Sequence, residues 1–99
     1  MMTELDPHVH QPTRLRIMML LSGVDRADFN FLRSTIGLTK GNLSSHMSRL
    51  EETRYMKVTK RFDGKIPNTS YGLTKLGRAR LNAYWKAIDE IRRSPGKAD

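Results

Sequence analysis

The residues from Lys40 to Leu50 place short hydrogen-bonding side chains at helical spacing. Leu43, Met47 and Leu50 recur at intervals of four and three, so they predict one buried helix face. The polar positions on the other faces are Lys40, Asn42, Ser44, Ser45, Ser48 and Arg49. Serine and asparagine are poor helix formers, and a face that is only solvated tends toward Glu, Lys, Gln and Ala. The pattern therefore favours directed contacts to a partner over simple solvation, because these side chains can address base edges and phosphates.

The charge distribution points to the same kind of partner. The chain has 99 residues, a net charge of +8 and a pI near 10.3. Acidic and basic residues balance up to position 53, so the whole positive excess lies in residues 54–99. A localised excess of this size is typical of polyanion binding, most simply nucleic acid, although it also keeps a protein soluble. Lys57, Lys60, Arg61 and Lys65 form its densest cluster, which would equally protect an exposed strand edge.

Other chemistry has little support in the sequence. There are no cysteines, which excludes disulfides and thiolate sites. His8, His10 and nearby Asp6 could suggest a metal, but two histidines without a third clear ligand are weak evidence. No catalytic triad, phosphate-binding glycine loop or paired-carboxylate cleft is visible. We therefore expect no enzyme activity, no metal and no cofactor.

Turn and capping residues divide the chain into a mainly α pattern in a single domain, residues 1–99. Asp6 and Pro7 predict a short helix start, and a first long helix is expected over residues 12–22, ended by Gly23. A short strand at 27–29 and a helix at 30–35 follow. Gly37 and Thr39 then predict a turn and the cap of a helix extending to residue 53. Alternation predicts strands at 56–62 and 69–73 with a loop at 65–68, and Thr74 begins a long helix to residue 92, ended by Ser94-Pro95-Gly96.

Helices followed by a two-stranded hairpin give the element order of a winged helix-turn-helix. In such a fold residues 39–53 form the recognition helix, which can enter the DNA major groove. Residues 56–73 form the hairpin called the wing, and residues 74–92 form a long C-terminal helix for dimerisation. Thr39, at the start of the recognition helix, is included among the expected DNA contacts.

A second subunit is expected because the first helix is apolar almost all round and a chain of this length buries a modest core. The last helix adds an apolar stripe. The expected dimer contacts are Leu15, Met18, Met19, Leu81, Tyr84, Trp85, Ile88 and Ile91. Tyr84 and Trp85 could instead line a ligand pocket, although helix packing is the more common use of such a stripe.

Four segments carry a family resemblance: Leu5–Pro7, His10–Ile17, Leu38–Glu51 and Tyr71–Arg78. They resemble the MarR/ArsR-like winged-helix regulators, in particular a compact archaeal and bacterial branch. The resemblance implies a homodimer on a pseudo-palindromic operator, with Lys40, Asn42, Ser44, Ser45 and His46 in the major groove. It also implies wing contacts by Arg61, Lys65 and Asn68.

Two positions depart from that family. Relatives tend to have glycine where this chain has Arg54, so either Arg54 accepts a strained backbone or the turn differs. The wing tip reads Lys65-Ile66-Pro67-Asn68, which is less basic than the arginine-rich tips of relatives. A deep arginine contact in the minor groove is therefore in doubt.

Together these observations predict a homodimeric transcription regulator that binds specific double-stranded DNA. The alternative is a winged helix used for protein–protein interaction or assembly; RNA binding is a third reading, with few aromatics for base stacking. No membrane-length apolar run or signal-peptide pattern is visible, so we expect a cytoplasmic protein. The sequence does not identify an effector, the operator or the regulated genes.

Overall fold

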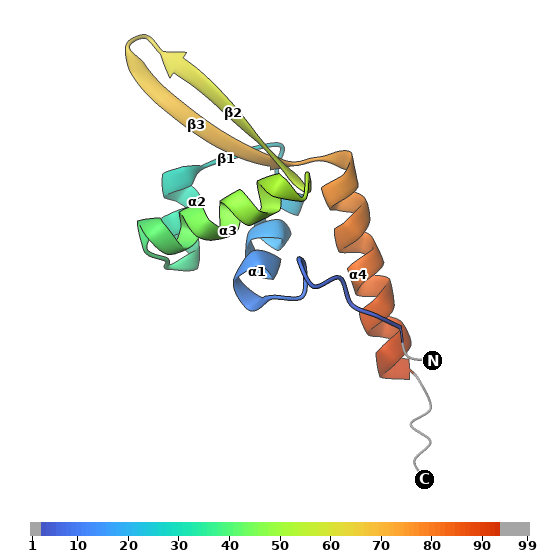
Figure 1. Ribbon diagram of the computed structural model, residues 1–99. Helices are drawn as coiled ribbons and strands as arrows, with labels where there is room; N and C mark the ends of the chain where they lie inside the picture. Colours follow the sequence, from blue (N-terminus) through green and yellow to red (C-terminus); the bar gives the residue numbers. More distant parts are fainter. Residues whose placement is uncertain (1–2, 94–99) are drawn as a thin grey trace.

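The computed structural model describes residues 3–93, which form four helices and a three-stranded antiparallel sheet (Figure 1). In chain order these elements are α1 (Pro12–Ser22), β1 (Ala27–Asp28), α2 (Phe29–Ile36), α3 (Lys40–Glu52), β2 (Met56–Asp63), β3 (Ile66–Leu73) and α4 (Lys75–Arg93). The predicted winged helix is confirmed, with its long C-terminal helix. The predicted end of that helix at Ser94-Pro95-Gly96 lies outside the described residues.

Local side-chain caps explain where three helices begin. Asp28 caps α2, with its Oδ1 accepting from the Phe31 amide at 2.7 Å. Thr39 Oγ1 accepts from the Asn42 amide at 3.1 Å at the start of α3. Thr74 Oγ1 accepts from the Gly77 amide at 2.9 Å. Each cap satisfies an amide that the first helical turn leaves without a partner, as the sequence predicted for Thr39 and Thr74.

The turn between α2 and α3 needs a left-handed residue, and Gly37 supplies it with φ of 81°. Arg54, just past α3, has φ of 65°. Of the two alternatives left open by the sequence, a strained arginine is therefore the correct one. Its carbonyl accepts from Thr74 Oγ1 at 2.6 Å, which helps hold the residue in this conformation.

The wing differs from the prediction at its tip. Residues 65–68 are not a loop, because β3 already begins at Ile66 and the turn contains only Gly64 and Lys65. Gly64 has φ of 65° at the first central position, which is the conformation that a two-residue II′ hairpin turn requires. Pro67 is tolerated because β3 has β2 on one side only there; β1 pairs with Ser70 and Tyr71 alone.

The predicted helix start at Asp6 and Pro7 is also wrong, since the segment forms a turn. Asp6 does act as a cap: its Oδ1 accepts from the His8 amide at 2.9 Å, and its carbonyl accepts from the His10 amide at 2.7 Å. The turn cannot continue as a helix because Gln11, the N-cap of α1, is extended at φ of −148°.

The core lies where the helices meet the base of the hairpin. The sheet order is β1-β3-β2, and all eight residues of β2 pair with β3, from Met56 opposite Leu73 to Asp63 opposite Ile66. The outer half of this hairpin projects from the helical body (Figure 1). Its residues 60–68 are all exposed, so the wing is available for contacts.

Close packing fixes α4 against the rest of the fold. A Cβ on Gly77 would lie 1.9 Å from the Tyr55 carbonyl oxygen, so only glycine fits. The Arg78 guanidinium donates to the Ser22 and Val24 carbonyls at 3.0 and 3.1 Å. The start of α4 is thereby fastened to the end of α1.

Candidate nucleic-acid interface

The predicted recognition helix, α3, presents its polar residues to solvent. Leu43, Met47 and Leu50 are buried in the core. The side chains of Lys40, Asn42, Ser44, Ser45, Ser48 and Arg49 are exposed, and Thr39 at the cap is also exposed. His46 is only half-buried because it lies toward α1. A helix with this division can place a hydrogen-bonding surface in a groove while its apolar face stays in the core.

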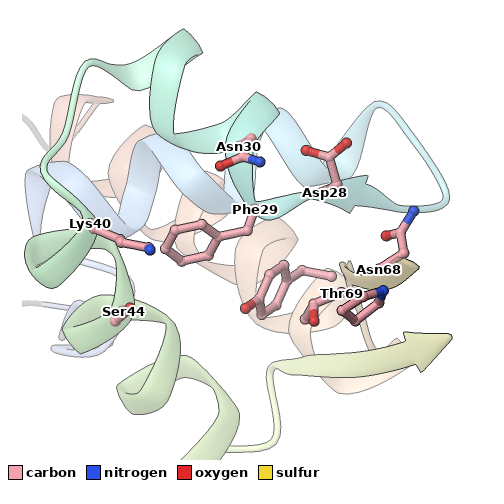
Figure 2. A pocket seen from close by; sticks show the side chains of 9 residues that line it. Asp28, Phe29, Asn30, Lys40, Ser44, Asn68 and Thr69 are labelled. Atoms are coloured by element: carbon pink, nitrogen blue, oxygen red, sulfur yellow. The ribbon is translucent and has the colours of Figure 1, made fainter. Parts of the chain in front are cut away.

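One flank of α3 forms an open cleft with the wing, about 520 Å³ in volume (Figure 2). Lys40 and Ser44 line it from α3, and Asn68 and Thr69 line it from β3. Asn30, at the start of α2, lies at its upper edge in Figure 2. The ammonium, hydroxyl and amide groups of this lining can donate to the oxygens of a phosphate backbone, while the carboxylate of Asp28 lines the same cleft.

The basic residues of the wing lie on both of its faces. Side chains alternate along a strand, so Lys60 and Arg61 point to opposite sides of the hairpin. Lys60 lines a second cleft of about 500 Å³ with Ser44 and Ser48 of α3. Arg61 lies on the other face, in a hollow with Asp28 of β1. The sequence analysis grouped Lys60 and Arg61 in one basic cluster, but the pleat of the strand puts their side chains on opposite faces of the hairpin.

Asn68 has a partner within the wing. Its Nδ2 donates to Asp63 Oδ2 at 3.1 Å, next to the turn that Lys65 occupies. The amide therefore braces the hairpin, although it also lines the cleft beside α3. Lys65 is exposed in the turn at the tip of the wing.

The other flank of α3 is cationic. Arg14 of α1, which the sequence analysis did not single out, brings its Nη1 to 3.4 Å from His46 Nδ1. Burial, then the positive charges of Arg14 and Arg49, lower the pKa of His46. Burial and the charge of Arg49 likewise lower the pKa of Arg14. The sequence shows Arg14 as one of two arginines in α1, the other being Arg16, but only the fold shows that Arg14 faces α3.

The expected dimer contacts divide into two groups. Met18, Leu81 and Tyr84 are 0%, 4% and 5% exposed, so they pack in the core of the single chain and offer no surface to a second one. Met19 and Trp85 are 48% and 39% exposed, and Leu15, Ile88 and Ile91 are half-buried. The first helix therefore owes most of its cover to its own chain, because α3, α4 and β3 all pack against it.

Polar pairs fasten the N-terminal segment to the body. Tyr55 donates to Asp6 at 2.5 Å, and burial followed by this bond raises the pKa of Tyr55 to about 12. His10 Nδ1 lies 2.8 Å from the Tyr84 hydroxyl. These contacts occupy His10 and Asp6, two of the three side chains that suggested a metal.

Within residues 3–93, no three histidine or acidic side chains are grouped so that they could hold a metal ion.

None of the helices in the described part of the chain combines the length and apolar character that a membrane span requires.

Comparison with known proteins agrees with this geometry. The sequence profile of the winged helix DNA-binding domain matches residues 13–91, nearly the whole of the described chain. The protein therefore belongs to the winged helix DNA-binding domain family. A curated relative, an uncharacterized protein of Methanocaldococcus jannaschii, is 32% identical over 71 residues, which is 72% of this chain and 77% of the relative.

Solved structures show the same fold in transcription regulators. The transcriptional regulator homologue of Pyrococcus horikoshii matches with a TM-score of 0.82 and 26% identity, over 90% of this chain and 88% of that one. A MarR-family regulator of Porphyromonas gingivalis matches with a TM-score of 0.67 and 17% identity, over 88% and 84%. The winged-helix DNA-binding class predicted from the sequence is thus confirmed, and the MarR-family neighbour shares its fold.

Proposed function

We propose that this protein regulates transcription by binding a pseudo-palindromic site in double-stranded DNA as a homodimer. The observation that carries this proposal is the placement of α3. Its exposed serines and Asn42 stand between an open cleft shared with the wing and a cationic flank beside α1. A helix with hydrogen-bonding groups at its centre and basic groups at its sides matches a major groove bordered by two phosphate backbones.

The recognition helix and the wing contribute differently to binding. Lys40 and Arg49 of α3 are balanced by Glu51 and Glu52, so the helix as a whole carries no net charge from these four residues. Its contribution is directional hydrogen bonding to base edges. The wing and the rest of the basic C-terminal half supply charge, which raises affinity for any duplex. We therefore assign specificity to α3 and most of the affinity to the wing.

Dimerisation is supported by the apolar surface that remains exposed. Met19 lies on α1 and Trp85 on α4, each more than a third exposed. Large exposed apolar side chains favour a contact with another protein surface. A dimer of two-fold symmetry would present two recognition helices to two half-sites, which is why a pseudo-palindrome is the matching operator.

The regulator acts by occupying its operator, where it blocks or recruits polymerase, in the cytoplasm where that DNA is found. It needs no catalysis, metal or cofactor for this role. No residue within the described range 3–93 identifies a small-molecule effector for this regulator.

A second candidate is a winged helix that binds a protein. Phe62 and Ile66 at the wing tip are 74% and 70% exposed, which favours an apolar contact there. In this case the hydrogen-bonding face of α3 would have no special role.

Fluorescence anisotropy with a labelled duplex, repeated over a series of salt concentrations, tests the proposal against this alternative. DNA binding predicts that log affinity falls linearly with log salt, by about 0.9 per phosphate neutralised. With several basic residues in contact the slope should be steep. Absence of binding at low salt, or binding that does not respond to salt, would contradict the proposal and favour a protein partner.

A further inference from the structure

We infer that Arg14, His46 and Arg49 form a second phosphate-binding site, on the flank of α3 that faces away from the wing. Arg14 belongs to α1, and the other two belong to α3. This inference rests on the proposed DNA-binding function and adds to it a specific contact with the opposite backbone.

The positions along α3 separate its two flanks. Ser44 and Ser48 line the cleft shared with β2 and β3. His46 lies on the other side of the exposed Ser45, where it meets Arg14. Arg49 follows His46 by three residues and therefore lies one turn along on the same side. A helix seated in a major groove about 12 Å wide has one phosphate backbone on each side. The wing flank thus meets one strand, and the Arg14 flank meets the other.

Arg14 is held in place before any ligand arrives. Its Nε donates to the His8 carbonyl at 2.8 Å, and its Nη2 donates to the Pro7 carbonyl at 3.4 Å. A guanidinium fixed in this way loses little conformational entropy on binding an anion, and its planar fork suits phosphate oxygens. The α1 helix therefore supplies a preorganised cation beside the recognition helix.

The contact between Arg14 and His46 also sets the tautomer of the histidine. Arg14 Nη1 can only donate, so His46 Nδ1 accepts and the ring proton resides on Nε2. The neutral ring can then donate a hydrogen bond from Nε2 to a phosphate oxygen without gaining a charge.

The electrostatics of this cluster favour an anion. The positive charges of Arg14 and Arg49 repel each other beside the neutral His46. After burial, this repulsion contributes to the lowered pKa of Arg14, and both charges contribute to the lowered pKa of His46. Among residues 3–93 no acidic side chain forms a salt bridge or hydrogen bond with any of the three; the ion pair found there joins Arg92 and Asp89 on α4. A phosphate would relieve this repulsion, which makes the cluster a binding site for DNA backbone.

The test compares Arg49→Gln, Arg49→Lys and His46→Ala in the full-length protein by anisotropy with random-sequence duplex DNA. Arg16→Gln is the matched control, because Arg16 is an exposed cation of α1 that lines a different surface, beside Met19 and Ile36. Arg49→Gln should flatten the slope of log affinity against log salt by about one unit. Arg49→Lys should retain the wild-type slope. His46→Ala, measured at pH 8, should weaken binding several-fold with no change of slope, because a neutral donor releases no counterion.

Two outcomes would overturn the inference. If Arg49→Gln changes the slope no more than Arg16→Gln does, the flank does not contact phosphate. If His46→Ala binds as the wild type does, the histidine has no role in the site. Melting temperatures of all four variants show whether each is folded. The wild type is measured on the same duplex. If the inference is wrong but the proposed function is right, the wild type still binds with a salt-dependent affinity; if the proposed function is wrong, it does not.

Discussion

The side chain of Asn42 offers a sharp test of how α3 recognises DNA. Asn42 is exposed in the first turn of the helix, where its backbone amide donates to Thr39 Oγ1. No other residue in the described part of the chain hydrogen-bonds with its side-chain amide. Truncation to alanine therefore removes a group that is available to a base edge and leaves the helix cap intact.

The expected size of the effect follows from this geometry. A bidentate contact between asparagine and adenine contributes about 1–3 kcal/mol of discrimination. Asn42→Ala should therefore weaken binding to the preferred duplex by roughly 5-fold to 150-fold, at about 1.4 kcal/mol per tenfold change. Binding to random duplex should change little, because the substitution removes no charge.

The assay measures anisotropy on preferred and random duplexes together with the melting temperature. Thr39→Ala is the control for stability, measured by melting temperature alone, since Thr39 caps the same turn and is itself an expected DNA contact. Loss of an N-cap destabilises a protein by about 1 kcal/mol, which should lower the melting temperature by about 4–8 °C in a domain of this size. Asn42→Ala should melt as the wild type does. Equal loss of affinity on both duplexes with unchanged melting would refute the assignment of specificity to α3.

Three further changes test other parts of the molecule. Lys65→Ala at the wing turn should weaken binding to every duplex and flatten the salt slope by about one unit in the same assay, whereas Lys86→Ala on the exposed side of α4 should flatten it less. Equal slopes for the two variants would remove the wing from the interface. Trp85→Glu should shift the protein from twice the 11.4 kDa chain mass to monomer or aggregate in sedimentation at micromolar concentration, and a monomeric wild type would contradict dimerisation. The raised pKa of Tyr55, about 12, favours the neutral phenol in the folded state, so its contribution to stability is complete below pH 10 and is lost as the pH rises toward 12. Denaturant titrations at pH 9 and 11 should show this loss in the wild type and less of it in Tyr55→Phe; identical pH dependence would contradict the raised pKa of Tyr55.

Local signals in the sequence were sufficient for most of the fold. The caps at Thr39 and Thr74 and the left-handed Gly37 follow from side-chain chemistry within a few residues, and all three were predicted. The wing tip was not, because Pro67 suggests a loop unless it is known that β3 lacks a neighbour on one side there. Strand pairing is a long-range property, so turn residues alone could not reveal it.

The same distinction separates what was predicted of the site from what was not. The polar face of α3 follows from helical periodicity, and its exposure is as expected. The contact of Arg14 with His46 joins residues 32 positions apart, and no local pattern predicts it. Burial of Met18, Leu81 and Tyr84 within one chain is likewise a result of packing between α1 and α4. An apolar stripe cannot show whether its cover comes from its own chain or from a second copy.

The most direct test of the central claim is selection of bound duplexes from a random DNA pool by the full-length wild-type protein. The account predicts enrichment of a pseudo-palindromic sequence with half-sites about one helical turn apart, or a multiple of it, with Asn42→Ala relaxing the preference within each half-site. Recovery of a pool with no sequence preference would contradict specific regulation by this winged helix.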